Sequence, residues 1–204
     1  MTMPDQHTYA TLIIGAGFSG LGAAIRLAEA GVDDVVILER SGRVGGTWRD
    51  TQYPGASCDV PSLLYSYSFA KNPKWSRTYS PAPEIYRHLE EMATRFDVRR
   101  QIRFGHQVSG LTFDEDAGAW TATTTNRKRF RARTVVLASG PLSDASFPEM
   151  RGLDSFQGHK IHSARWDSEY DFTGKRVAVI GTGASAIQIV PELVKKAGFV
   201  KVFQ

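Results

Sequence analysis

The sequence of 204 residues contains one cysteine, Cys58, and no apolar run long enough to cross a bilayer. A single cysteine cannot form an internal disulfide, which fits a reducing compartment, so we expect a cytoplasmic protein. The longest apolar runs, such as Thr134–Ala138, have the length of a strand, whereas a membrane span needs about 20 residues. The first residues include Pro4 and Asp5, and we expect no signal peptide there. These observations predict a protein without a membrane partner.

The sequence also lacks a large excess of either charge. Lysine and arginine number 25 and aspartate and glutamate 21, a net charge of +4 that is too small to argue for a nucleic-acid partner. The densest basic stretch, Arg127–Arg133, alternates like a strand that leaves a turn. We interpret it as a solvated hairpin edge rather than a nucleic-acid surface.

A glycine-rich loop, Gly15-x-Gly17-x-x-Gly20, stands between a short apolar run and a segment with helical spacing. In this motif the first glycine permits a tight turn, the second lets the backbone approach a pyrophosphate, and the third lets helix and strand pack closely. The helix N-terminus adds free N–H groups and positive potential. Residues 10–14, 15–20 and 21–30 are therefore predicted as the strand, loop and helix of a dinucleotide-binding βαβ unit, with Gly31 ending the helix.

The second strand of this unit is predicted at Asp34–Glu39, and its last residue is acidic. A carboxylate at Glu39 accepts hydrogen bonds from ribose hydroxyls and repels a 2′-phosphate. The first loop is therefore predicted to bind FAD or NAD rather than NADP.

The rest of the chain predicts a second unit of the same kind after a meander. We expect a helix over 80–96 with Ser80 as its N-cap, antiparallel strands within 102–136, and a buried strand ending near Ala138. A strand over 175–180 then leads to a second glycine loop, Gly181–Ala186, and to a helix that Pro191 should kink or delay. Val200–Phe203 begins another strand. The fold class is α/β with an antiparallel insertion.

Between the two loops lies a run of the form F-x-G-x-x-x-H-x-x-x-W-D, at Phe156–Asp167. Together with Gly45–Trp48 and Tyr53–Asp59, this run resembles the signature of Baeyer–Villiger monooxygenases, which belong to the class B flavin monooxygenases. The resemblance covers Thr11 to Gln204. It implies an FAD-binding Rossmann-like fold and a reaction in which NADPH reduces FAD, O₂ is captured as a C4a-peroxyflavin, and a ketone becomes an ester or lactone.

The resemblance also implies roles for single residues. Asp59 and His162 are expected at the catalytic centre, and no metal is expected. Asp59 would lie near the flavin, Tyr65 would contact FAD, and Val108 would meet the adenine through its backbone. The residues expected to bind FAD or NADP are Gly15, Gly17, Phe18, Ser19, Gly20, Glu39, Arg40, Gly46, Thr47, Trp48, Ser57, Cys58, Asp59, Tyr65, Val108, Gly181, Thr182, Gly183, Ala184, Ser185 and Ala186.

Several residues have a plainer interpretation as well. Asp59 could be a turn aspartate that bonds its own loop, and Cys58 is better explained as a small buried thiol than as a nucleophile. His162 suits an interdomain hinge better than a general base. Related enzymes that oxidise nitrogen or sulfur have Tyr or Phe at the position of Trp166 and no acid at that of Asp167, so this pair favours ketones. A non-catalytic FAD-binding remnant is the remaining alternative.

The domain organisation predicted from these motifs has three parts. Residues 1–150 form the first portion of an FAD-binding domain, residues 151–173 a linker with the F-x-G run, and residues 174–204 the start of an NADP-binding domain. Since a Rossmann sheet needs further strands after 204, we expect an N-terminal portion of such an enzyme, inactive by itself.

Overall fold

The computed structural model describes residues 7–142 and 144–204, which form two compact units. The first unit contains the residues before Asp50 and those from Tyr86 onward up to 142, and the second contains Asp50–Ile85 and the residues from Asp144. The domain limits predicted at residues 150 and 173 stay a prediction. Pro4 and Asp5, on which the expectation about a signal peptide rests, lie outside the described residues.

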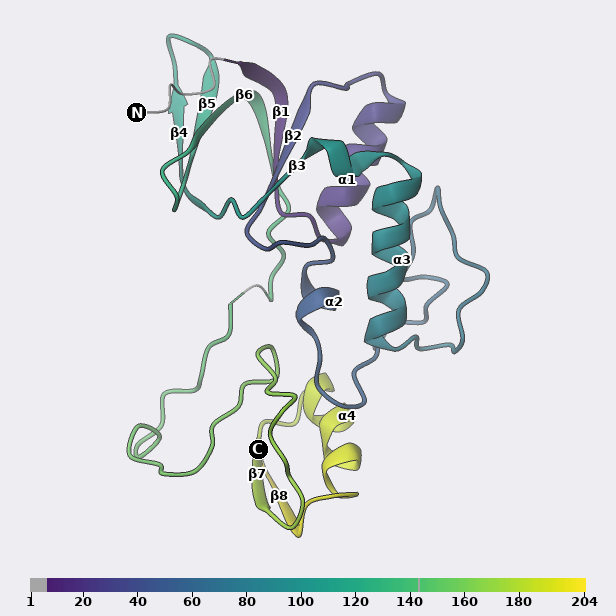
Figure 1. Ribbon diagram of the computed structural model, residues 1–204, viewed down its shortest axis with the longest axis vertical. Helices are drawn as coiled ribbons and strands as arrows, with labels where there is room; N and C mark the ends of the chain where they lie inside the picture. The colour runs from purple at the N-terminus through teal and green to yellow at the C-terminus, as the bar shows by residue number, and fades with distance from the viewer. Residues whose placement is uncertain (1–6, 143) are drawn as a thin grey trace. The chain divides into compact units, whose positions relative to one another are not determined.

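The first unit is built on a six-stranded sheet with the order β3-β2-β1-β6-β5-β4 (Figure 1). Strands β1, β2, β3 and β6 run parallel, whereas β5 and β4 continue the sheet as an antiparallel meander. The strands are Thr8–Ile14 (β1), Val35–Glu39 (β2), Ile102–Phe104 (β3), Val108–Asp114 (β4), Ala119–Thr124 (β5) and Arg129–Leu137 (β6). The α/β fold with an antiparallel insertion is confirmed.

Two details of this sheet correct the sequence-based interpretation. β3 was expected within the antiparallel region, but it pairs parallel with β2, in register at Ile37 and Ile102. The basic stretch Arg127–Arg133 was expected at a hairpin edge, yet β6 lies between β1 and β5. The hairpin is confirmed, since β5 and β6 pair antiparallel across a turn in which Arg127 and Lys128 are exposed, but β6 is an interior strand and the edge is wrong.

Helix α1, Phe18–Glu29, follows the first strand and turns an apolar face inward. Leu21, Ala24 and Ile25 have the i, i+3, i+4 spacing of one helix face, and each is at most 1% exposed. Gly31 follows the helix with φ of +81°, which confirms the expected left-handed end. The other helices here are α2 (Thr47–Asp50) and the short 3₁₀ helix η1 (Val98–Gln101).

Helix α3, Ala82–Arg95, begins later than the sequence suggested. The N–H groups of Glu84 and Ile85 donate to the carbonyl of Pro81, so Pro81 occupies the N-cap position. Ser80 as N-cap is wrong. Its buried hydroxyl accepts a hydrogen bond from the hydroxyl of Ser62 at 2.7 Å and bonds no helical N–H.

The second unit contains one βαβ element. Strands β7 (Arg176–Ile180) and β8 (Phe199–Phe203) pair in parallel, and helix α4 (Ala184–Leu193) connects them. Pro191 does not delay this helix, which starts directly after the second glycine loop, so the late start is wrong and a kink stays a prediction. Nowhere in 7–142 or 144–204 is a helix both long and apolar enough to span a membrane.

Candidate dinucleotide-binding sites

The first glycine loop can exist only with glycine at two of its positions. Gly15 has φ of +102° and donates its N–H to the carbonyl of Leu38 at 2.8 Å. A Cβ on Gly15 would lie 2.6 Å from the carbonyl oxygen of Ala138, and a Cβ on Gly20 would lie 1.9 Å from that of Gly15. Strand, loop and helix therefore lie so close together that no side chain fits at Gly15 or Gly20.

Gly17, the second glycine of the motif, faces a second bare backbone. A Cβ on Gly17 would lie 3.5 Å from the Cα of Gly46, and a Cβ on Gly46 would lie 3.0 Å from the Cα of Gly17. Gly45 donates its N–H to the carbonyl of Ala16 at 2.9 Å, which holds the two loops together. Side chains at either glycine would occupy the space at the N-terminus of α1, where a pyrophosphate would bind.

Glu39 ends β2 and ties the glycine loop to its surroundings. Its side chain is 5% exposed, and Oε2 accepts the N–H of Ala16 at 2.8 Å. Oε1 accepts the N–H of Ser41 at 2.9 Å and Nη1 of Arg49 at 3.1 Å. Each carboxylate oxygen accepts about two hydrogen bonds, so Oε2 retains capacity for a ribose hydroxyl.

Arg49 was not among the residues expected from the sequence. Its side chain is 13% exposed, and its guanidinium also donates to the carbonyl of Arg43 at 2.9 Å, so Arg49 closes the loop after β2 over Glu39. No pattern in the sequence links residues 39 and 49, because their contact depends on the path of the loop between them.

Val108 lies near the same end of β2 through backbone contacts. The N–H of His106 donates to the carbonyl of Glu39 at 2.9 Å, and the N–H of Gly105 to that of Ser41 at 3.2 Å. The chain therefore passes the carboxyl end of β2 just before β4 begins at Val108. In parallel α/β sheets this end is the one that binds ligands.

The second unit contains the loop from Tyr53 to Asp59. Ser57 forms an isolated bridge with Pro81, and Cys58 donates its N–H to the carbonyl of Ser80 at 3.0 Å. Cys58 is 2% exposed, and burial raises the pKa of its thiol. Its interpretation as a buried thiol is confirmed. Asp59 follows at an exposed position.

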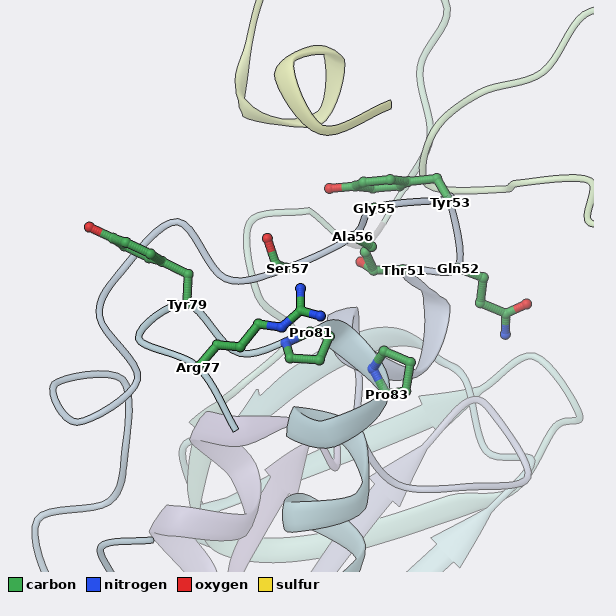
Figure 2. Close-up of a pocket in the computed structure, with 10 residues that line it drawn as sticks. All are labelled: Thr51, Gln52, Tyr53, Gly55, Ala56, Ser57, Arg77, Tyr79, Pro81 and Pro83. Atoms are coloured by element: carbon green, nitrogen blue, oxygen red, sulfur yellow. The ribbon is translucent and has the colours of Figure 1, made fainter. Parts of the chain in front are cut away.

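A shallow pocket of about 320 Å³ opens beside this loop (Figure 2). Tyr53 and Tyr79 stand on different sides of it, and the guanidinium of Arg77 extends between them in this view. The Tyr53 hydroxyl already donates to Gln188, whereas Arg77 can only donate, so the pocket offers a cationic donor to an acceptor on a ligand. It is lined by Thr51, Gln52, Tyr53, Gly55, Ala56, Ser57, Arg77, Tyr79, Pro81 and Pro83.

The second glycine loop has the backbone of a dinucleotide-binding turn. Gly181 has φ of +104° and donates its N–H to the carbonyl of Phe203 at 2.8 Å. Gly183 caps α4, and its carbonyl accepts the N–H of Ile187 at 3.1 Å. The free N–H groups at the start of α4 therefore lie at the carboxyl end of β7, where an anion would bind.

Within the F-x-G run, His162 makes local contacts. Its Nδ1 accepts the N–H of Ala164 at 3.1 Å, and the ring of Phe147 packs edge-on at 5.5 Å between centroids. His162 also forms an isolated bridge with Arg165. These contacts make it a well-held residue of a turn, and its role as hinge or base stays a prediction.

Asp167, the acid of the same run, pairs with a histidine that the sequence interpretation passed over. Nε2 of His159 lies 2.9 Å from Oδ2 of Asp167, and the His159 ring stacks on Tyr170 with centroids 4.2 Å apart. Trp166 stacks on Phe172 at 5.4 Å. Since the partners are eight residues apart in a segment without regular structure, sequence spacing gave no signal for them.

The expected site residues therefore fall into two groups. The first unit contains Gly15, Gly17, Phe18, Ser19, Gly20, Glu39, Arg40, Gly46, Thr47, Trp48 and Val108. The second unit contains Ser57, Cys58, Asp59, Tyr65, His162, Gly181, Thr182, Gly183, Ala184, Ser185 and Ala186.

Comparisons with known proteins identify the family and the fold. The family model described as pyridine nucleotide-disulphide oxidoreductase matches residues 12–204. A Baeyer–Villiger monooxygenase of Streptomyces coelicolor is 52% identical over 192 residues, which cover 94% of this chain and 37% of that protein. The chain thus spans little more than a third of this relative's length.

Two solved structures are similar over almost the whole chain. The structure of OTEMO in complex with FAD and NADP is 35% identical with a TM-score of 0.88, covering 100% of this chain and 40% of the other. The structure of cyclohexanone monooxygenase with bound epsilon-caprolactone is 37% identical with a TM-score of 0.88, covering 98% and 40%.

Proposed function

Because the chain belongs to the pyridine nucleotide-disulphide oxidoreductase family and, within it, to the Baeyer–Villiger monooxygenases, we propose that its protein converts ketones into esters or lactones. In this reaction one atom of O₂ enters the product and the other leaves as water, while NADPH supplies two electrons. FAD, when bound and reduced, supplies the chemistry that activates O₂. The protein binds and orients the reactants and excludes water.

We assign FAD to the first unit. The observation that supports this most directly is the buried Glu39 carboxylate, which is bonded to the N–H of Ala16 in the glycine loop and retains capacity for a ribose hydroxyl. The N-terminus of α1 would hold the pyrophosphate. Gly46 would leave room beside it, and the backbone at Val108 would meet the adenine.

We assign NADPH to the second unit, at the start of α4. Gly181 and Gly183 expose the helix N-terminus, and Ala186 stands where the first loop has Gly20. Asp59 would supply a carboxylate near the flavin, and His162 would act as a hinge residue of the linker. The buried, unpaired Cys58 fits a cytoplasmic location.

Trp166 and Asp167 support ketones over amines or thioethers as substrates, because the related enzymes that oxidise nitrogen or sulfur have Tyr or Phe at the first of these positions and no acid at the second. Trp166 stacks on Phe172, and Asp167 pairs with His159, whose ring stacks on Tyr170.

The test uses ¹⁸O₂. The protein that contains this sequence is given FAD, NADPH and separate panels of cyclic ketones, amines and thioethers, and the products are analysed by mass spectrometry. A lactone that gains one ¹⁸O atom, with one NADPH consumed, is the expected result. Oxidised amines or sulfides without lactone would contradict the ketone assignment, and failure to bind FAD in a fluorescence titration would contradict the whole proposal.

A further inference from the structure

Gln188, on the second turn of α4, uses its whole amide on the loop from Tyr53 to Asp59. Its Oε1 accepts the hydroxyl of Tyr53 at 2.9 Å and the N–H of Ser57 at 3.3 Å. Its Nε2 donates to the carbonyl of Ser57 at 2.9 Å and to the hydroxyl oxygen of Ser57 at 3.1 Å. Two donors and two acceptor sites are thereby satisfied, which is the full capacity of the side chain.

The backbones of the loop and the helix also touch. Gly55 has φ of +79°, and a Cβ there would lie 2.6 Å from the backbone carbonyl oxygen of Gln188. The loop therefore lies directly against α4, and the four hydrogen bonds join closely packed groups. If the Gln188 side chain instead extended through solvent to reach the loop, it would constrain the position of the loop much less.

The other side of the loop is held by the first residue of α3 and by the segment just before this helix. Ala82 donates its N–H to the carbonyl of Ala56 at 2.9 Å, and Cys58 donates to Ser80 at 3.0 Å. Asp59 is the next residue, so the position of its backbone follows from contacts on both sides of residues 56–58. Gln188 supplies the contact on the helix side.

We propose that Gln188 is a positioning residue, which fixes the Asp59 loop to the helix that starts at the second glycine loop. The inference rests on the proposed function, in which NADP binds at the start of α4 and Asp59 acts beside the flavin. Gln188 lies five residues after Gly183, so the N-terminus of the helix is connected to the backbone next to Asp59 through one helix and four hydrogen bonds. Binding of the dinucleotide should therefore stabilise the loop.

Cys58 is a built-in reporter for this loop, because it is the only cysteine in the sequence and is 2% exposed. The experiment measures the rate at which 5,5′-dithiobis(2-nitrobenzoate) modifies Cys58 in native protein at constant pH. Gln188→Leu removes all four hydrogen bonds with little change in volume. Gln188→Glu keeps the acceptor for Tyr53 and for the N–H of Ser57. Ile187→Ala, at a neighbouring side chain that is 70% exposed, is the matched control.

We expect Gln188→Leu to raise the labelling rate about tenfold or more, since losing two or more net hydrogen bonds favours the open loop by at least that factor. Gln188→Glu should give an intermediate rate and Ile187→Ala the wild-type rate. Unchanged labelling in Gln188→Leu, or an equal increase in Ile187→Ala, would overturn the proposal.

Adding NADP⁺ provides the second readout. In the wild type it should slow labelling by about fivefold, a typical coupling between two sites, and in Gln188→Leu the protection should disappear although calorimetry still detects NADP⁺ binding. Equal protection in both proteins would overturn the positioning role. Absence of NADP⁺ binding to the wild type would instead refute the cofactor assignment of the second unit, and labelling without NADP⁺ would still decide the role of Gln188.

Discussion

In the first glycine loop, Gly15 has φ of +102° and donates its N–H to the end of the neighbouring strand at 2.8 Å, and in the second loop Gly181 does the same with φ of +104° and the same distance. The residues that cap the two helices also agree, with φ and ψ of −85° and −165° at Gly17 and −73° and −178° at Gly183. A strand, a turn and a helix in this order thus produce one backbone geometry in two separate units.

The surroundings of the two loops differ. A Cβ on Gly15 would meet the carbonyl of Ala138, which belongs to the chain just after β6. Among the described residues nothing comes within 4 Å of the corresponding Cβ positions on Gly181 and Gly183. The positive φ is therefore common to both loops, and within the described residues a close backbone contact accompanies it in the first.

The third position of the motif shows the same difference. Gly20 has no room for a methyl group, since its Cβ would lie 1.9 Å from the carbonyl oxygen of Gly15. The second loop has Ala186 there, so the first turn of α4 must lie farther from the carbonyl of Gly181. The same motif therefore permits two distances between helix and strand, and the side chain at the third position indicates which one is used.

The largest effect is expected from exchanging the residues at this third position. Gly20→Ala forces backbone against backbone and should destabilise the first unit by about 3 kcal/mol or more. Ala186→Gly only adds flexibility to a helix and should cost about 1 kcal/mol. Urea unfolding followed by circular dichroism measures both, and equal costs would show that the two helices pack alike.

Substituting the first glycine separates the effect of φ from that of packing. Gly181→Ala should cost about 1–2 kcal/mol, because an L-residue is placed at positive φ. Gly15→Ala pays the same penalty and also meets the Ala138 carbonyl, which should add about 1–3 kcal/mol. The same unfolding measurement applies. If the two variants are equally stable, the contact with Ala138 is not restrictive.

Glu39 should distinguish the ligands of the two loops. Glu39→Gln keeps the shape, but its NH₂ must face a donor, either Ala16 on one side or Ser41 and Arg49 on the other. We expect FAD to bind about tenfold to a hundredfold more weakly, with NADP⁺ affinity unchanged.

Fluorescence titration measures FAD affinity and calorimetry that of NADP⁺. Glu29→Gln, at an exposed pair with Arg26, is the control with the same loss of charge. Unchanged FAD affinity in Glu39→Gln would contradict the assignment of FAD to the first loop.

The smallest effect should be a dependence of stability on pH, and it should come from His88 in the first unit. Burial lowers the pKa of His88 below its ordinary value of 6.5. The unfolded chain then binds more protons than the folded one below that pH, so stability should fall as the pH drops through 6.5. Thermal melts at pH 7.5 and 5.5 measure this, and His88→Gln should show a weaker pH dependence. If the wild type and His88→Gln show the same dependence of stability on pH, His88 is not the group responsible.

Much of the fold could be predicted from local pattern. The alternation of apolar runs, glycine turns and helical spacing identified both βαβ units and the antiparallel meander, because each pattern reflects a periodicity of the backbone itself. The sequence was less informative where a residue's environment depends on partners far along the chain. Arg127–Arg133 has the composition of an edge strand, yet pairing with both β1 and β5 makes it interior.

The candidate sites divide in the same way. The sequence by itself determined the glycine loops and the acid at Glu39, since motif spacing alone sets where a tight turn ends in a helix N-terminus. Only the tertiary structure decided that Arg49 closes over Glu39, that His159 pairs with Asp167, and that Gln188 holds the Asp59 loop. These side chains meet across 8 to 135 residues of chain, and such contacts depend on how loops without periodicity are packed, which no local propensity encodes.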